Sequence, residues 1–292
     1  MTLLGNYTAL VTPFLINGQI DFTSLQNLVR YQIHNKTEGI VALGSTAEAS
    51  SLDGYEKHKV METVLSITEN KTKVITGVNA FSLDNALLQC HQRFIDGADA
   101  LLISPPPYIK PTKKGLDNYF LTLADQSYIP IILYNIPSRT GISIPIKSLE
   151  RLSSHPNIIG IKEASGDMNY STQITQFISN KFSLLAGNDN LLLPLLSIGA
   201  TGIISVIGNI LPSLCSQTIR LYTQNKAQEA KKLYFSQIDL INALSLESNP
   251  ICIKYVLNKL GMIKQYYRKP LCPPSKQTKI QLNNHIKKLD IF

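Results

Sequence analysis

Short apolar segments alternate with amphipathic segments at a regular interval through about the first 210 residues of the chain. Continuous apolar runs of this length are typical of parallel strands that are covered on both faces, usually by helices. Eight strands that alternate with helices over this length match the size of a (β/α)8 TIM barrel, and we predict this fold. The predicted strands are residues 7–14, 39–44, 73–78, 100–106, 130–135, 158–164, 182–187 and 202–208.

The segments between the predicted strands have helical periodicity. After Asp21, a predicted N-cap, apolar residues recur on one helical face, and similar stretches occupy about 54–68, 82–96 and 115–126. A doubly wound open sheet is the structural alternative, but no G-x-G-x-x-G motif follows the first predicted strand.

Beyond residue 210 the strand signals fade, while helical spacing continues towards the C-terminus. We therefore predict a barrel domain over residues 1–225 and a C-terminal helical extension over residues 226–292.

The formal net charge of +8 raises the possibility of a nucleic-acid partner. The lysines and arginines are spread along the chain, with small groups such as Lys113-Lys114 and Lys287-Lys288, and no nucleic-acid motif surrounds them. The charge therefore indicates a basic, solvated surface and no nucleic-acid partner.

Cysteine, histidine and apolar spacing exclude several other classes. The four cysteines are scattered without a C-x-x-C pair, which predicts neither a zinc knuckle nor a disulfide framework and favours a reducing cytoplasm. The five histidines lack metal-ligand spacing, so we expect no metal and no cofactor. No unbroken apolar run is long enough for a membrane span, and the N-terminus does not resemble a secretion signal.

Chemically versatile residues follow the predicted strands at their carboxyl ends, which is where TIM barrels carry their active sites. Each has an ordinary structural explanation, such as a helix cap, a surface ion pair or an amphipathic plug. Residues with only those roles would be distributed over both ends of the barrel, so their common location predicts a site. The set comprises Ser45, Thr46, Glu48, Tyr108, Tyr134, Arg139, Lys162, Gly187, Ile204 and Ser205.

Lys162 directly follows the apolar run Ile158, Ile159 and Ile161. The strand could simply end there, with the amine in water. Alternatively, the amine is poorly solvated, which makes the uncharged, nucleophilic form more accessible. In the second case the amine could add to a ketone and lose water to form an imine, while a tyrosine moves protons and an arginine binds a carboxylate.

Several motifs resemble those of the pyruvate-dependent Schiff-base lyase and synthase family that includes N-acetylneuraminate lyase. The similarity extends from ALVTPF near the N-terminus to NPICIK at 249–254, and the segments LYNIPSRTG (133–141) and IIGIKEASGD (158–167) match closely. The resemblance implies that Lys162 forms the Schiff base with pyruvate. It also implies that Tyr134 is the general acid and base, connected to Thr46 and Tyr108 in a proton relay.

The same resemblance implies roles for the remaining residues. Ser45 and Thr46 match the hydroxyl pair of the family's GTTGE loop, where Thr46 would hold the pyruvate carboxylate, and the main chain near Gly187 and Ile204 would line the same pocket. Arg139 would receive the carboxylate of L-aspartate 4-semialdehyde. The tyrosine that matches Tyr108 enters the neighbouring subunit's site in this family, which implies a homo-oligomer, commonly a tetramer.

Arg139 within SRTG favours the synthase branch of the family. The implied reaction is a class I carbon-carbon condensation of pyruvate with L-aspartate 4-semialdehyde, the first committed step of diaminopimelate and lysine biosynthesis. One alternative is an aldolase for N-acetylneuraminate or a 2-keto-3-deoxy sugar acid, which would share Lys162 and Tyr134. A second, from another class, is a barrel that binds a ligand without catalysis.

Two departures from the family pattern are evident. GTTGE reads GSTAE, so Ala47 replaces a glycine, and a positive φ at this position would strain the loop. Many family members are inhibited by lysine, which binds polar and aromatic side chains near a subunit interface. The matching positions here lack most of those groups, which predicts weak or absent inhibition by lysine; they are Gly54, Lys57, Phe81, Asn85 and Pro107.

Overall fold

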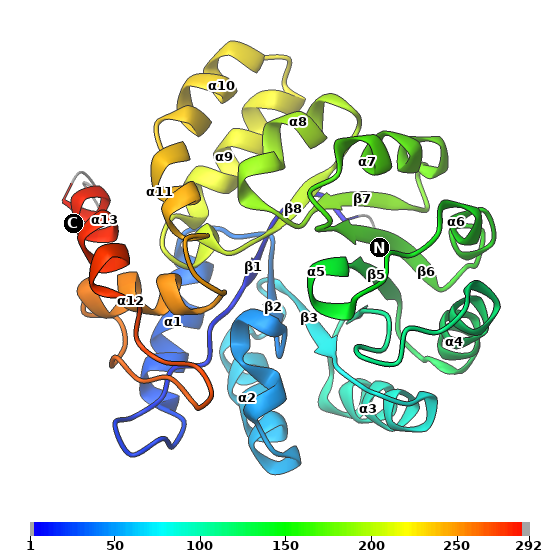
Figure 1. Ribbon diagram of the computed structural model, residues 1–292, viewed down its shortest axis with the longest axis horizontal. Helices are drawn as coiled ribbons and strands as arrows, with labels where there is room; N and C mark the ends of the chain where they lie inside the picture. Colours follow the sequence, from blue (N-terminus) through cyan, green and yellow to red (C-terminus); the bar gives the residue numbers. More distant parts are fainter. Residues whose placement is uncertain (1–2, 288–292) are drawn as a thin grey trace.

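Eight parallel strands close into a barrel, with each strand hydrogen-bonded to its neighbour in chain order and β8 paired with β1 (Figure 1). The structure is a computed structural model and describes residues 3–287. The predicted TIM barrel is confirmed. The strands are β1 Gly5–Ala9, β2 Gly39–Ala42, β3 Lys73–Val78, β4 Ala100–Ile103, β5 Ile131–Asn135, β6 Ile158–Glu163, β7 Ser183–Ala186 and β8 Gly202–Ser205.

Helices connect the strands and surround the barrel, and further helices follow β8. Those of the barrel are α1 Phe22–His34, α2 Gly54–Thr68, α3 Leu83–Asp96, α4 Lys113–Gln126, α5 Pro137–Thr140, α6 Ile146–Leu152, α7 Met168–Ile174, α8 Leu192–Ser197 and α9 Pro212–Thr223. The later helices are α10 Ala227–Phe235, α11 Ile238–Ala243, α12 Ile251–Lys259 and α13 Lys276–Ile286.

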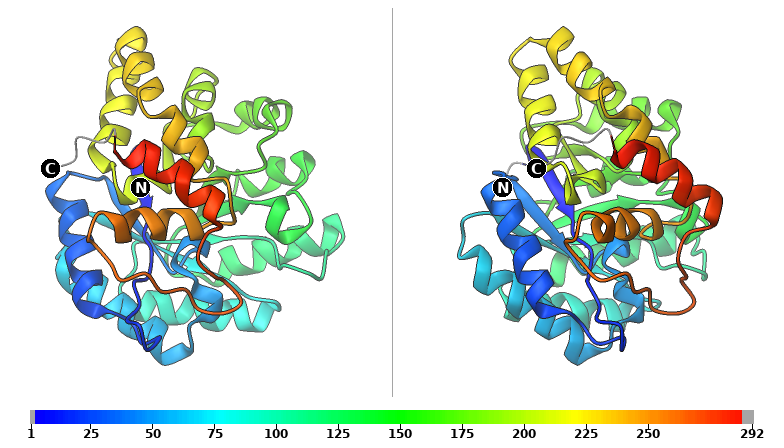
Figure 2. Two further views of the ribbon diagram at one scale, coloured as in Figure 1. Left: turned by 60° about the vertical axis from the view of Figure 1, so that its left-hand side comes forward. Right: turned by 90° about the vertical axis from the view of Figure 1, so that its left-hand side faces the viewer.

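The later helices lie against one side of the barrel. Figure 2 shows α12 and α13, in orange and red, next to each other and close to the carboxyl ends of the first strands, and α11 and α12 both pack on α13. The predicted division at residue 225 stays a prediction, because α10 packs closely on α9. Residues 288–292 of the predicted extension lie outside the described residues.

Three predicted strands extend at least three residues beyond the carboxyl ends of the observed strands. The first strand ends at Ala9, because the chain leaves the sheet before Pro13. Leu10, Val11 and Phe14 nevertheless remain buried. The fourth ends at Ile103, ahead of three prolines, and the eighth gives way to a 3-10 turn, η5 (Ile207–Asn209). An apolar run marks a buried segment, but it does not mark where the ladder of hydrogen bonds ends.

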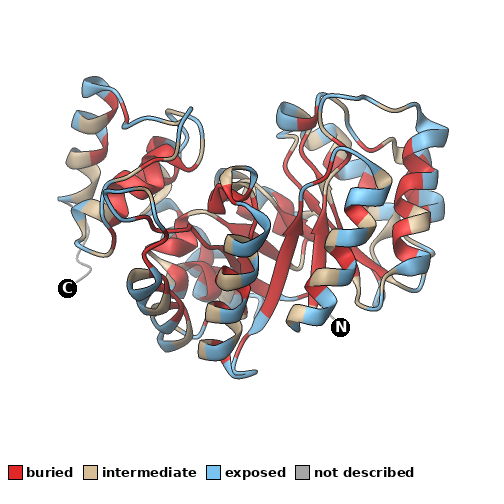
Figure 3. Ribbon diagram, turned by 90° about the horizontal axis from the view of Figure 1, so that it is seen from below, coloured by how far each residue is buried: buried red, intermediate tan, exposed pale blue. Residues whose placement is uncertain are grey.

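The barrel interior is a small apolar cluster of its own. The buried strands are red in Figure 3, whereas the outer faces of the surrounding helices are exposed. The interior cluster consists of Leu3, Tyr7, Ala9, Val41, Ile75, Ala100, Leu102, Ile132, Ile159, Leu185 and Ile204, with Tyr134 packed against it. This packing fills the barrel, so a site can form only at its end.

No helix within residues 3–287 is both long enough and apolar enough to cross a membrane.

Candidate active site

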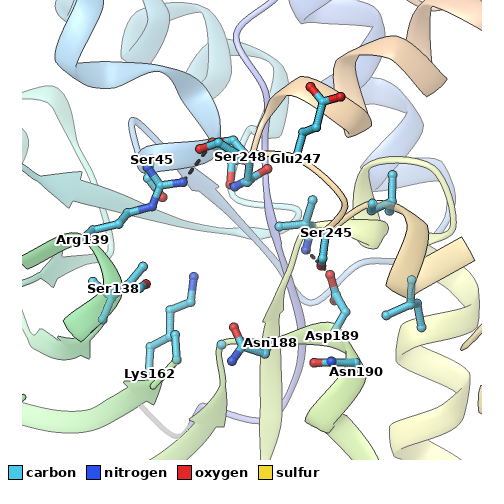
Figure 4. A pocket seen from close by; sticks show the side chains of 18 of the residues that line it. Ser45, Ser138, Arg139, Lys162, Asn188, Asp189, Asn190, Ser245, Glu247 and Ser248 are labelled. Atoms are coloured by element: carbon cyan, nitrogen blue, oxygen red, sulfur yellow. Dashed lines mark hydrogen bonds between the residues drawn. The ribbon is translucent and has the colours of Figure 1, made fainter. Parts of the chain in front are cut away.

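A cavity of about 750 Å³ opens at the carboxyl ends of the strands, between the barrel and the segment that joins α11 to α12 (Figure 4). This is the end of the barrel at which the sequence predicted a site. The residues that line it are Ser45, Thr46, Tyr134, Ile136, Ser138, Arg139, Lys162, Ala164, Gly187, Asn188, Asp189, Asn190, Val206, Ile241, Leu244, Ser245, Leu246, Glu247, Ser248 and Asn249.

Lys162 and Tyr134 form one wall of this cavity. They are register partners on β6 and β5, so their side chains leave the sheet at the same level and on the same side. The amine of Lys162 lies over the Tyr134 ring, with Nζ 4.4 Å from the ring centroid, and the lysine is only 5% exposed. The amine points into the cavity rather than into bulk solvent (Figure 4). Of the two interpretations of Lys162, the structure therefore favours the poorly solvated amine.

The hydroxyl loop, residues 44–48, forms a second wall. Ser45–Ala47 make a 3-10 turn that begins three residues after the end of β2, with Thr46 buried and Ser45 partly exposed. Thr46 Oγ1 accepts a hydrogen bond of 2.8 Å from Asn249 Nδ2. Within residues 3–287, the Ser45 hydroxyl has no hydrogen-bond partner. One hydroxyl is thus held in place and its neighbour is available to a ligand.

Arg139 reaches the cavity from a short helix, α5. Pro137 starts this helix, and Gly141 ends it in the left-handed conformation, with φ of 77°. Arg139 is exposed on the cavity surface, and its Nη2 donates a 2.9 Å hydrogen bond to the main-chain oxygen of Asn249. Asn249 therefore contacts both Arg139 and Thr46, through its carbonyl and its side-chain amide respectively.

The floor between β6 and β8 is held by main-chain contacts and one partly buried carboxylate. Gly187 donates to the Glu163 carbonyl at 2.7 Å, and a Cβ at this position would lie 2.6 Å from that oxygen, so only glycine fits. Asp189 accepts from Ser205 Oγ at 2.6 Å and from two main-chain N–H groups after β8. Burial raises the pKa of the Asp189 carboxyl, and the nearby charge of Lys162 opposes this rise.

Six of the predicted site residues therefore line a single cavity: Ser45, Thr46, Tyr134, Arg139, Lys162 and Gly187. Tyr108 is not among the lining residues. Its side chain is 89% exposed, and its backbone has a positive φ of 74°. Ile204 lies in the barrel interior beneath the cavity, and Val206 of the same segment lines it instead.

Glu48, another residue of the predicted set, does not line the cavity. It is 4% exposed, lies behind the loop, and forms an ion pair with Lys254. The ion pair accounts for a buried charge at this position.

Comparison with known proteins shows which family the chain belongs to. A family model described as "Dihydrodipicolinate synthetase family" matches residues 2–289. The chain belongs to this family.

Individual relatives of the family cover nearly the full length. A 4-hydroxy-tetrahydrodipicolinate synthase of Thermodesulfovibrio yellowstonii is 38% identical over 278 residues, covering 95% of each chain. One from Geobacter metallireducens is 36% identical over 99% of each chain. Among solved structures, a chloride-inhibited dihydrodipicolinate synthase of Acinetobacter baumannii complexed with pyruvate superposes with a TM-score of 0.96. The two are 35% identical over 100% of each chain.

The departure from the family's GTTGE pattern produces no backbone strain at Ala47. Ala47 lies in the 3-10 turn and is not among the residues with positive φ; the left-handed conformation falls on Glu48, with φ of 53°. Its methyl group is buried, and Ala47 does not line the cavity. The concern that this alanine strains the loop is therefore not supported.

Sequence reasoning did not assign a role to Asn249 or Asp189. Asn249 begins the NPICIK motif, which helped to show the resemblance, and Asp189 is the third residue after β7, two positions beyond Gly187. Only the packing of the chain shows that the two side chains reach the cavity. Within residues 3–287, no group of three or more His, Cys, Asp or Glu side chains is arranged to hold a metal ion.

Proposed function

We propose that this chain is a 4-hydroxy-tetrahydrodipicolinate synthase, which condenses pyruvate with L-aspartate 4-semialdehyde through a Schiff base. Family membership and full-length relatives of this name support the proposal. The observation that carries it is the buried amine of Lys162 over the Tyr134 ring, in a cavity that also holds Arg139. The Lys162 amine is the only nucleophile that the protein must supply, so no cofactor enters the proposal.

Lys162 carries the covalent intermediates of the reaction. Its uncharged amine adds to the keto carbon of pyruvate, and loss of water gives an imine. Removal of a proton from the pyruvate methyl group then gives an enamine. Its terminal carbon attacks the aldehyde carbon of the second substrate, and the new alkoxide takes up a proton. The amino group of the added semialdehyde finally attacks the imine carbon, which releases Lys162 and closes the ring.

Tyr134 carries the protons for these steps, because its hydroxyl shares the cavity wall with the Lys162 amine. The hydroxyls of Thr46 and Ser45 have separate roles. Thr46 accepts from Asn249, so its own hydrogen is directed elsewhere and can be donated to the pyruvate carboxylate. Ser45 has no partner within the described residues and is available, with Thr46, to relay protons to and from Tyr134.

Arg139 binds the carboxylate of the semialdehyde. A guanidinium presents several N–H donors in one plane and can bind a carboxylate in a bidentate manner, which fixes the orientation of the aldehyde. The hydrogen bond from Nη2 to the Asn249 carbonyl holds the guanidinium at the cavity edge. Gly187 and the main chain at Val206, two residues after Ile204, complete the pocket around pyruvate.

Tyr108 acts in the site of a second copy of the chain, which makes the enzyme a homo-oligomer, with a tetramer as the family's common state. The strongly exposed phenol and its positive φ support this proposal, since a tyrosine in this conformation is uncommon unless other contacts maintain it. Complementation tests it. Tyr108→Phe and Lys162→Met subunits, each impaired alone, should recover activity when they are unfolded and refolded together. If the mixture gains no activity, Tyr108 does not act across an interface.

Trapping with borohydride tests the proposed function. The protein is reduced in the presence of pyruvate, and the modified peptide is mapped by mass spectrometry. We expect a pyruvyl adduct on Lys162 and no adduct in Lys162→Met. An adduct on another lysine would refute the role of Lys162. No adduct at all would refute the mechanism and favour a barrel that binds a ligand without catalysis.

Turnover then separates the synthase from its relatives. We expect condensation with aspartate semialdehyde to exceed cleavage of N-acetylneuraminate or a 2-keto-3-deoxy sugar acid by orders of magnitude. Preferential cleavage of a sugar acid would assign the chain to the aldolase alternative.

A further inference from the structure

A second cluster of charged residues lies behind the hydroxyl loop, outside the cavity. Lys254 Nζ is 2.5 Å from Glu48 Oε1, and the two side chains are 0% and 2% exposed. Neither residue lines the cavity. The pair joins positions 206 residues apart, because Glu48 follows β2 and Lys254 belongs to α12.

Further contacts surround this ion pair from several elements. The second oxygen of Glu48 accepts a 3.2 Å hydrogen bond from the Arg268 main-chain N–H. Lys254 Nζ lies 4.3 Å from the ring centroid of Phe14 and 5.5 Å from that of Tyr267. Both ionised groups therefore have partners, while water is excluded from them.

Stability alone is a poor explanation for such a pair. Two ions removed from water lose their hydration, and well-packed apolar residues often give an equally stable fold. Burial lowers the pKa of the Lys254 amine, which shows that the surroundings oppose its charge. A buried pair is more readily explained if it fixes one arrangement of the segments that it joins.

The joined segments are the hydroxyl loop and the start of α12. Asn249 donates to Thr46, and Lys254 donates to Glu48, so two residues of one segment hold two residues of the other. Glu48 also has φ of 53°, a conformation that a non-glycine residue adopts only when its contacts maintain it. The carboxylate held by Lys254 thus belongs to the residue where the loop turns away from Ser45 and Thr46.

We propose that Lys254 is a positioning residue, which acts through Glu48 to hold the Ser45 and Thr46 hydroxyls in place for pyruvate. This inference rests on the proposed function of the cavity, because it assigns the loop to the pyruvate half of the reaction. Loss of the pair displaces the hydroxyls and weakens pyruvate binding, whereas Arg139 and the semialdehyde are affected less.

The test uses a double variant, Glu48→Gln with Lys254→Met. Lys254→Met alone would leave a buried carboxylate without its cation and destabilise the fold, whereas the double variant removes both charges and keeps the side-chain volumes. We expect it to fold, as judged by circular dichroism. We expect its KM for pyruvate to rise by about tenfold or more, which corresponds to the loss of about one hydrogen bond to the substrate. KM for the semialdehyde should stay within about twofold of the wild-type value.

Two further variants serve as controls. Glu48→Gln alone keeps an acceptor for Lys254 but leaves its buried ammonium without a counter-charge, so it should lower the melting temperature. The folded variant should retain most of the wild-type affinity for pyruvate. The ion pair between Arg93 and Asp96 on α3 is similarly buried, at 5% and 1% exposure, and neither residue lines the cavity. Arg93→Met with Asp96→Asn also removes a buried ion pair, and it should leave KM for pyruvate unchanged.

The outcomes distinguish this inference from the proposed function. If wild-type Lys162 is trapped by pyruvate and borohydride but the double variant has a wild-type KM for pyruvate, Lys254 has no positioning role. The same conclusion follows if the Arg93 and Asp96 variant raises this KM equally. If wild-type Lys162 is not trapped at all, the proposed function fails before the variants are compared.

Discussion

Lys162 Nζ lies over the ring of Tyr134, 4.4 Å from its centroid, and the two residues are register partners on adjacent strands. The barrel thus presents an amine and a phenol on one wall without any loop to position them. Side chains on adjacent strands of a closed sheet have little freedom to separate, so the arrangement is in place before a substrate binds.

Tyr134→Phe separates the ring from its hydroxyl. The ring remains under the amine, but proton transfer is lost, so we expect kcat to fall by about 10²- to 10⁴-fold, the usual contribution of a general acid or base. Steady-state kinetics with both substrates measure this effect, and the borohydride adduct on Lys162 should form more slowly. A kcat near the wild-type value would assign proton transfer to another group.

Arg139→Met removes the predicted partner of the semialdehyde carboxylate. We expect KM for the semialdehyde to rise by about 10- to 100-fold, which corresponds to the loss of charge-assisted hydrogen bonds. KM for pyruvate should change much less, and trapping of Lys162 should persist, because the first half-reaction does not use this side chain. An equal rise in both KM values would instead indicate that the variant disturbs the whole cavity.

Ala47→Gly restores the family's residue in the hydroxyl loop. Because Ala47 does not adopt a positive φ, glycine gains no conformational advantage there and increases the entropy of the unfolded chain. We expect the free energy of unfolding to fall by about 0.5–1 kcal/mol, with kcat and KM within about twofold of wild type. Denaturant titration and steady-state kinetics measure these quantities. A gain in stability would show that the loop requires glycine after all.

Free lysine should inhibit this enzyme weakly or not at all. Lys57 stands at one of the positions that bind lysine in many relatives, and a second ammonium group beside it is repelled. Phe81 and Asn85 are exposed and supply no carboxylate to the ligand. Activity measured across a lysine series tests this expectation, and half-inhibition below about 1 mM, a binding free energy of roughly −4 kcal/mol, would contradict it.

Stability should decline in alkaline solution as buried thiols are forced to ionise. Burial raises the pKa of Cys90 to about 12 and that of Cys252 to about 11. In the unfolded chain both thiols have a pKa of about 8.5. Folding thus favours the protonated thiols, and their contribution is complete below about pH 8.5 and is lost as the pH rises towards those higher values. Each thiol should contribute a slope of about 1.4 kcal/mol per pH unit in this interval.

Chemical denaturation at several pH values measures this decline, and Cys90→Ala should reduce its slope. In the native protein at pH 8, a thiol reagent should react rapidly with Cys272, which is exposed, while Cys90, Cys215 and Cys252 react only on unfolding. Rapid modification of several thiols in the native state would contradict this assignment.

The barrel could be predicted because its signal is local. Eight apolar runs of strand length, separated by helical periodicity, specify the elements, and the predicted helices at 54–68 and 82–96 agree closely with α2 and α3. The strand ends were less accurate at Ala9 and Ile103, because buried apolar residues continue past the last ladder hydrogen bond. Lys162, Tyr134 and Arg139 could be placed at one end because parallel strands share a direction.

The sequence by itself determined the fold and the residues offered at the carboxyl ends of the strands, since both follow from patterns within short segments. Only the tertiary structure decided which of them meet, and it added the segment that begins α12. Asn249 reaches Thr46 and Lys254 reaches Glu48 across more than 200 residues of chain. No local pattern encodes such contacts, because they depend on how the later helices pack against the barrel.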